Sequence, residues 1–228
     1  MQAKDVMTTN VISVSEDSSV HEVVGLLLKN RISALPVIDG ARKVVGIISE
    51  GDLLRPEGKS SAATPRSRWL ERIVKGEAGN YQKELGRTAG AVMTRNVIAV
   101  GEDAPLNEIA GLLERHHIKR VPVVSNDQLV GIVSRANLLH GLANIIVEHH
   151  EPGATKDRAL RAELMRVLLN KLNTGLVNVT VSDGNVRLWG EVESPDEAGV
   201  AEAAAKSLAG VKSVENNLRP GPVSGVPI

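Results

Sequence analysis

The apolar positions near the start of the chain change their spacing along the sequence, and these changes predict alternating strands and helices. Val11–Val14 is short, apolar and rich in β-branched residues, whereas the apolar residues of Val20–Leu28 recur at helical spacing. Ala34–Ile38 and Val44–Ile48 are two further apolar segments on either side of a polar turn, which is typical of paired strands. A second helix is predicted from about Glu50. The predicted order of elements is therefore β-α-β-β-α.

The same pattern occurs a second time later in the chain. Ala3–Val14 (AKDVMTTNVISV) matches Ala89–Val100 (AGAVMTRNVIAV), and Val44–Leu54 (VVGIISEGDLL) matches Leu129–Leu139 (LVGIVSRANLL). Each copy of the second motif predicts an apolar strand, a serine at its end, and a polar residue three positions later at the start of a helix. The duplication predicts two copies of one unit, related by a pseudo-twofold axis and each covering an apolar face of the other.

The last third of the chain has a different predicted order, α-β-β-α-β. Its elements are an amphipathic helix, a hairpin around a D-G turn, an Ala-rich helix and a final strand: Ala159–Leu172, Val177–Val181, Val186–Val192, Ser194–Leu208 and Val211–Leu218. Leu160, Leu164 and Leu168 lie on one stripe of the first helix. The cations of that helix are expected largely off the stripe: Arg158, Arg161, Arg166 and Lys171.

Composition excludes several classes of function. The 27 basic residues are balanced by 27 acidic ones, so no overall field attracts nucleic acid or an anionic membrane. Cysteine is absent, which excludes disulfides and thiolate metal sites. The aromatic residues are Trp69, Tyr81 and Trp189, so stacking platforms for single-stranded nucleic acid are nearly excluded. Because the sequence has neither a signal-peptide pattern nor a membrane-length apolar segment, we expect a cytoplasmic protein.

The repeated motifs resemble a tandem pair of cystathionine β-synthase (CBS) domains. The resemblance rests on V-M-T near the start of each copy, Pro-Val on a strand, and G-I-I-S-x-x-D. It implies an α/β fold, a homodimer, and an adenine nucleotide ligand (AMP, ADP, ATP or a related adenosyl compound, with or without Mg²⁺) in clefts between the two repeats. In the family, the serine or threonine of the last motif reaches phosphate and the aspartate holds the ribose hydroxyls. These roles fall on Ser49 and Asp52.

The second copy departs from this pattern. Ser134 matches, but Asn137 stands where the aspartate is expected, and an amide offers one acceptor oxygen where a carboxylate offers two. The basic pair Lys119-Arg120 precedes the strand proline, where the family often carries cations that meet phosphate. We therefore hypothesise that the two clefts are unequal and that at most one binds tightly. The candidate nucleotide-binding residues are Ile12, Ser33, Ala34, Pro36, Ser49, Asp52, Lys119, Arg120, Pro122, Ser134 and Asn137.

These residues also have a purely structural interpretation. A serine followed three positions later by an acid or amide is close to a capping box, which stabilises a helix by roughly 1 kcal/mol without any ligand. Lys119 and Arg120 alone are typical of solvated surface charges. The histidines have no metal-ligand spacing, and the adjacent His149 and His150 would point in different directions on a helix, so we expect no metal site.

The last third of the chain resembles a BON domain. The resemblance rests on G-x-V-x-L-x-G at Gly184–Gly190 and G-V-x-x-V-x-N at Gly210–Asn216. It implies an interaction module that contacts phospholipid or other envelope material, and the basic first helix is compatible with this role. A helix whose cations merely face water is the alternative. The predicted domains are 1–55, 89–147 and 154–220, with linkers at 56–88 and 148–153 and a disordered tail at 221–228.

Two functional hypotheses follow. In the first, the protein is a non-catalytic sensor, and nucleotide binding is passed to the BON-like domain through the helix Leu138–Val147. In the second, the repeats are a dimerisation scaffold with empty clefts, and the BON-like domain binds phospholipid or an envelope partner. An enzyme is not expected, because the sequence shows no nucleophile–base arrangement, metal-ligand cluster or P-loop. An amphipathic segment around Trp69 in the first linker is either a packed connector or a docking helix for a partner.

Overall fold

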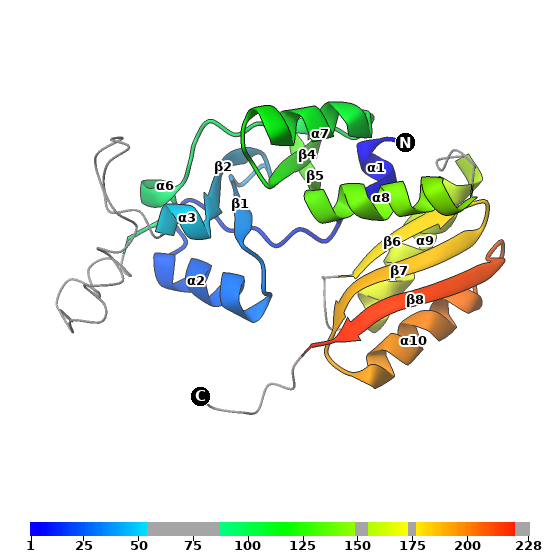
Figure 1. Ribbon diagram of the computed structural model, residues 1–228. Coiled ribbons are helices and arrows are strands. Elements are labelled where there is room, and N and C mark those ends of the chain that lie inside the picture. Colours follow the sequence, from blue (N-terminus) through cyan, green and yellow to red (C-terminus); the bar gives the residue numbers. More distant parts are fainter. Residues whose placement is uncertain (54–86, 149–154, 173–176, 222–228) are drawn as a thin grey trace. The chain divides into compact units, whose positions relative to one another are not determined.

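The structure is a computed structural model of the 228-residue chain, and it describes residues 1–53, 87–148, 155–172 and 177–221. The predicted amphipathic segment around Trp69, the pair His149 and His150, and residues 222–228 of the tail lie outside the described residues. The fold is mixed α/β (Figure 1). It divides into two compact units, which are residues 12–98 with 126–129, and residues 1–11 with 99–125 and 130–228.

The unit formed by residues 12–98 contains most of the first repeat. Its described elements are α2 (Val20–Lys29), β1 (Ala34–Ile38), β2 (Val44–Ser49), α3 (Glu50–Leu53) and α6 (Ala89–Val92). Ser19 caps the start of α2, because its hydroxyl oxygen accepts a hydrogen bond from the Glu22 N–H at 3.1 Å. β1 and β2 are antiparallel. The predicted strand at Val11–Val14 is reduced to a single parallel bridge between Val14 and Val37.

An aliphatic core holds this unit together. Its buried residues come from α2, both strands, α6 and the two segments that flank them: Val14, Val23, Leu27, Leu35, Val37, Ile48, Ala89 and Met93. Burying one Val, Leu or Ile side chain contributes roughly 1.5–3 kcal/mol, so the core needs no aromatic residue. The core fixes the end of β2, which is where the first signature serine lies.

Most of the second repeat belongs to the other unit, together with the N-terminal segment of the first repeat. The elements are α1 (Ala3–Val6) from the first repeat and, from the second, β3 (Val100–Gly101), α7 (Leu106–Arg115), β4 (Arg120–Ser125), β5 (Gln128–Ser134) and α8 (Arg135–Glu148). The strand order is β3-β4-β5, and β3 is parallel to β4. The short helices α1 and α6, one in each repeat, were not predicted from the sequence.

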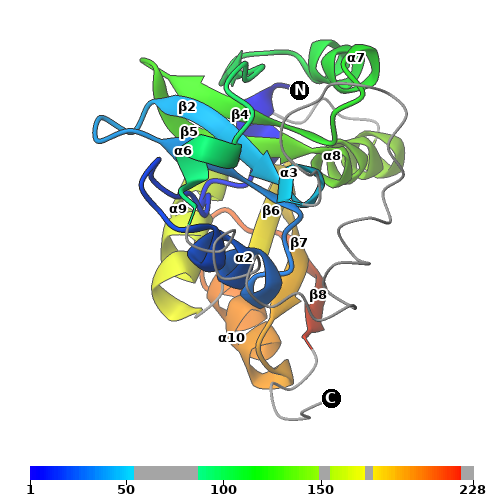
Figure 2. The ribbon, with the colours of Figure 1, turned by 90° about the vertical axis from the view of Figure 1, so that its left-hand side faces the viewer.

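The same unit contains the C-terminal domain, which has the predicted α-β-β-α-β order. Its elements are α9 (Thr155–Lys171), β6 (Val177–Ser182), β7 (Asn185–Val192), α10 (Pro195–Lys206) and β8 (Ser213–Pro220). The central strand β7 is antiparallel to β6 and parallel to β8 (Figure 2). The predicted D-G turn is confirmed: Asp183 has φ 47° and Gly184 has φ 76°, as a tight hairpin requires.

Both faces of β6 are buried. Val177, Val179 and Val181 point into the core formed with α9 and α10. The alternating polar residues lie on the opposite face and are buried as well: Asn178, Thr180 and Ser182. One prediction for this domain is wrong. Arg161 of α9 was expected off the apolar stripe, yet it is only 6% exposed, because backbone carbonyls and Asn178 surround its guanidinium.

Candidate functional site

The first signature turn joins β2 to α3 and brings three polar side chains together. Oδ2 of Asp52 accepts hydrogen bonds from the Ser49 N–H at 2.8 Å and from the Ser49 hydroxyl at 2.6 Å. The Thr94 hydroxyl donates to the other carboxylate oxygen, Oδ1, at 3.2 Å. Ser49 and Asp52 are both half-buried. The bond from the Ser49 N–H to Asp52 is one half of a capping box, so this pair does contribute to the start of the helix.

The V-M-T motif of the second copy packs against this strand of the first. Thr94 and Ile47 exchange two backbone hydrogen bonds, each of 3.0 Å. The side chain of Met93 occupies the space beside Gly46, where an added Cβ atom would overlap with the methionine Sδ. The glycine of the signature strand is therefore explained by the methionine that lies against it.

The second signature turn, between β5 and α8, has the same geometry with an amide in place of the carboxylate. Oδ1 of Asn137 accepts from the Ser134 N–H at 2.8 Å and from the Ser134 hydroxyl at 2.6 Å. Nδ2 of Asn137 donates to the Val6 carbonyl oxygen at 2.9 Å and to the Thr8 hydroxyl at 3.3 Å. The Asn137 N–H donates to the Ser134 hydroxyl at 3.4 Å, which completes a capping box.

Here the V-M-T motif comes from the first copy. Thr8 and Ile132 exchange backbone hydrogen bonds of 3.0 Å, and Met7 lies against Gly131 as Met93 does against Gly46. The two turns are thus built alike, and each combines the signature strand of one copy with the V-M-T segment of the other.

The two turns differ in the hydrogen bonds that they can still form. A carboxylate can accept about four hydrogen bonds, and donors within the described residues supply three to Asp52. An amide can accept two and donate two, and all four positions of the Asn137 side chain are used. Asn137 is also only 5% exposed. Asp52 can therefore accept a further bond from a ligand hydroxyl, whereas Asn137 would first have to give up a bond within the protein.

Several other candidate residues lie beside these turns. In the first copy the Glu50 N–H donates to the Ser33 carbonyl at 3.0 Å, and Ala34 is paired with Ser49 across the strands. In the second copy the Arg135 N–H donates to the Lys119 carbonyl at 3.3 Å. The pair Lys119-Arg120 and its counterpart Ser33-Ala34 thus occupy equivalent places.

The remaining candidates are less close to the turns. Pro36 and Pro122 are buried in β1 and β4, and Ile12 is half-buried two residues before Val14, whose N–H donates to the Pro36 carbonyl at 3.1 Å. The polar groups that sequence reasoning missed are Thr94 and Thr8. The repeated V-M-T motif was the available signal, because it places a threonine at the same position of each copy.

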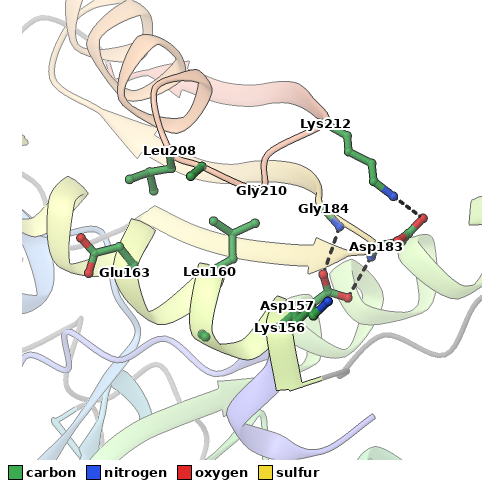
Figure 3. Close-up of a pocket in the computed structure, with 11 residues that line it drawn as sticks. Lys156, Asp157, Leu160, Glu163, Asp183, Gly184, Leu208, Gly210 and Lys212 are labelled. Atoms are coloured by element: carbon green, nitrogen blue, oxygen red, sulfur yellow. Dashed lines mark hydrogen bonds and ion pairs between the residues drawn. The ribbon is translucent and has the colours of Figure 1, made fainter.

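The C-terminal domain contains a separate open pocket of about 700 Å³ (Figure 3). Leu160 of α9 and Leu208 face each other across it, while Lys156 and Lys212 line its edge. The buried carboxylate of Asp157 accepts from the N–H groups of Asp183 at 2.8 Å and Gly184 at 3.0 Å, which ties α9 to the hairpin turn. This pocket was not predicted from the sequence.

Among residues 1–53, 87–148, 155–172 and 177–221, no group of three or more His, Cys, Asp or Glu residues is arranged to hold a metal ion. None of the helices there combines the length and the apolar character needed to cross a membrane.

Comparison with known families gives matches over most of the chain. The CBS domain model matches residues 3–56 and 89–144, and the BON domain model matches residues 156–222. Among curated relatives, the uncharacterized protein MJ1426 of Methanocaldococcus jannaschii is 32% identical over 156 residues, which are 62% of this chain and 91% of that protein. The chloroplastic CBS domain-containing protein CBSX1 of Arabidopsis thaliana is 34% identical over 139 residues, but the match spans only 59% of its length and 58% of this chain.

A solved structure shares the fold of the repeats. The crystal structure of CBSX2 from Arabidopsis thaliana is 27% identical, with a TM-score of 0.51, and the match covers 66% of this chain and 98% of that one. CBSX2 has also been crystallised in complex with AMP; that structure is 27% identical, has a TM-score of 0.49, and matches 64% of this chain and 98% of its own.

Proposed function

Because this chain belongs to the CBS domain family and carries a C-terminal BON domain, we propose that it is a non-catalytic regulatory protein that binds an adenine nucleotide. The proposed ligand is AMP, ADP or ATP, and the proposed site is the first signature turn. In this role the Asp52 carboxylate holds a ribose hydroxyl and the Ser49 hydroxyl reaches phosphate. Nucleotide binding changes the conformation of the repeats, and this conformational change is passed on to the C-terminal domain, which acts as the output module.

The acceptor capacity of Asp52 that no donor among the described residues uses is the observation that carries this proposal. Three donors in that part of the chain orient the carboxylate, which can accept about one more hydrogen bond. A ribose hydroxyl is a donor of the right kind, and a hydrogen bond to an ionised group contributes about 1.5–3 kcal/mol. Asn137 has no such position free, so the second turn would bind ribose weakly. Lys119 and Arg120 remain proposed phosphate contacts of the second copy.

Titration calorimetry of the full chain with AMP, ADP and ATP, with and without Mg²⁺, tests the proposal. We expect about one nucleotide per chain and a roughly tenfold or larger loss of affinity in Asp52→Asn. This substitution gives the first turn the amide that the second turn already has, so the turn should still form. Asp17→Asn, which changes an exposed carboxylate, is the control and should bind like the wild type. If no adenine nucleotide binds the wild-type protein, the sensor function is wrong.

A second function is favoured by the pocket of the C-terminal domain. Its apolar walls at Leu160 and Leu208, with Lys156 and Lys212 at the edge, would suit an anionic amphiphile such as a phospholipid. Lys212 is held by an ion pair with Asp183 at 2.8 Å, so Lys156 is the better candidate to meet a head group. In this case the repeats are a scaffold. Sedimentation of the full chain with anionic vesicles tests this function. Loss of sedimentation in Lys156→Glu and at high salt would support it, whereas unchanged sedimentation of Lys156→Glu would exclude this pocket as the lipid-binding site.

We also propose that two copies of the chain associate through the repeats. Two leucines of α8 support this proposal: Leu139 is 64% exposed and Leu142 is 48% exposed. They are three positions apart and so lie on one side of the helix, where burial against a second copy would remove apolar surface from water.

A further inference from the structure

The carbonyl oxygen of Val6 accepts hydrogen bonds from two buried asparagines. One is Nδ2 of Asn137 in the second signature turn, at 2.9 Å, and the other is Nδ2 of Asn178 in β6 of the C-terminal domain, also at 2.9 Å. Both asparagines are 5% exposed. A carbonyl has two lone pairs, so the two amides together saturate this single acceptor.

Arg161 of α9, in the C-terminal domain, also bonds to the N-terminal segment next to Val6. Its guanidinium donates to the carbonyl oxygens of Met7 at 2.6 Å and Lys4 at 3.0 Å, on either side of Val6. It also donates to the Val179 carbonyl at 2.7 Å and to Oδ1 of Asn178 at 3.3 Å. The N-terminal segment is therefore bonded on one side to the second signature turn and on the other side to the C-terminal domain.

This arrangement gives a physical reason for asparagine at position 137. An ionised aspartate has no donor and would place a carboxylate oxygen against the Val6 carbonyl, so two acceptors would face each other in a buried site. An asparagine keeps the two bonds from Ser134 and adds the donor that the carbonyl requires. In the first turn the Thr94 hydroxyl donates to Asp52, and a carboxylate is the fitting partner there.

We propose that the second signature turn is the docking joint of the C-terminal domain, with the Val6 carbonyl as the acceptor shared by Asn137 and Asn178. The ribose-holding position of this copy has become a structural donor, and the domain is fixed to the second repeat through the N-terminal segment. If the joint is correct, only one turn per chain binds a nucleotide, and this consequence rests on the proposed function. The existence of the joint does not depend on that function.

Hydrogen–deuterium exchange of the full chain, measured without any nucleotide, tests the joint. In Asn137→Asp we expect exchange to become about tenfold faster in three places at once: the N-terminal segment 2–8, the turn 132–138 and strand β6. The matched swap, Asp52→Asn, exchanges the same chemical groups in the first turn and should leave the exchange of β6 unchanged. If Asn137→Asp speeds exchange in its own turn only, the joint is wrong.

A variant on the other side of the joint keeps the proposal testable if Asn137→Asp fails to fold. Asn178→Leu should speed exchange in the turn 132–138, because the N-terminal segment that bonds to this turn loses one of its bonds to the C-terminal domain. If that turn stays protected in a folded Asn178→Leu protein, the two amides are not coupled and the proposal fails. Because no nucleotide is present, neither result depends on nucleotide binding; conversely, a protein that binds no nucleotide can still show the joint.

Discussion

The imidazole of His140 lies parallel to the indole of Trp189, with ring centroids 4.5 Å apart and an angle of 9° between the planes. His140 belongs to α8 and Trp189 to β7, so the stack joins the last helix of the second repeat to the sheet of the C-terminal domain. Burial lowers the pKa of His140 below its ordinary value of 6.5. Its Nδ1 atom is buried and has no hydrogen-bond partner within the described residues.

We predict that protonation of His140 weakens this contact. Because the folded-state pKa lies below 6.5, the unfolded chain binds the proton more readily. The stabilising contribution of the neutral ring is complete above about pH 6.5 and decreases as the pH falls below that value. Urea unfolding midpoints between pH 7.5 and 5.5 should therefore fall in the wild type and fall less in His140→Phe, which keeps a stacked ring without a titrating group. His21→Gln, which removes an exposed histidine, is the control; an equal fall in His140→Phe would contradict the prediction.

We predict that Arg161 stabilises the unit through its charge-assisted bonds to backbone carbonyls. Desolvation lowers the pKa of its guanidinium to about 10, so the group is still charged at neutral pH. Arg161→Met would leave the carbonyls of Lys4, Met7 and Val179 without this donor, at a cost of about 3 kcal/mol in the free energy of unfolding. Arg166→Met, on the exposed side of the same helix, should change the unfolding midpoint little. Equal effects of the two substitutions in denaturant unfolding would show that the buried bonds contribute nothing.

The glycines of the signature strands give a third prediction. Gly46→Ala and Gly131→Ala should each lower stability by about 1–3 kcal/mol, because the added methyl group meets Met93 or Met7. At Gly25 in α2 an added Cβ atom would meet open space, so Gly25→Ala should instead stabilise the protein by about 0.5–1 kcal/mol. Thermal unfolding measures all three. The double variant Gly46→Ala/Met93→Ala should show a coupling between the two positions, and strictly additive effects would mean that they do not meet.

Local sequence patterns were enough to predict most of the elements and both signature turns. The duplicated motif placed Ser49 and Ser134 at strand ends, and the structure confirms this with β2 and β5. The D-G turn and the α-β-β-α-β order of the C-terminal domain were also predicted correctly. These features depend on residues close together in the sequence, where turn chemistry and periodicity determine the conformation.

Features that depend on distant partners could not be predicted in this way. The pattern of α9 placed Arg161 off the apolar stripe, but its burial is decided by carbonyls of the N-terminal segment, far away in the sequence. Likewise, the alternation in β6 predicted a strand without showing that Asn178 is covered on the polar face. Thr94 reaches Asp52 only because the V-M-T segment of one copy packs on the strand of the other. In each case periodicity identifies the face, but not what covers it.

The exposed leucines of α8 allow the proposed association of two chains to be tested directly. Leu139 is 64% exposed, and such a side chain is costly to hydrate on a face that also carries Leu142. We predict that the wild-type protein is a dimer by size-exclusion chromatography with light scattering, and that Leu139→Glu shifts it toward the monomer, because a buried unpaired carboxylate opposes association. Leu169→Glu, on α9 and 42% exposed, is the matched control and should remain dimeric. If the wild type is a monomer, or if Leu139→Glu stays dimeric while Leu169→Glu dissociates, α8 is not the contact between chains.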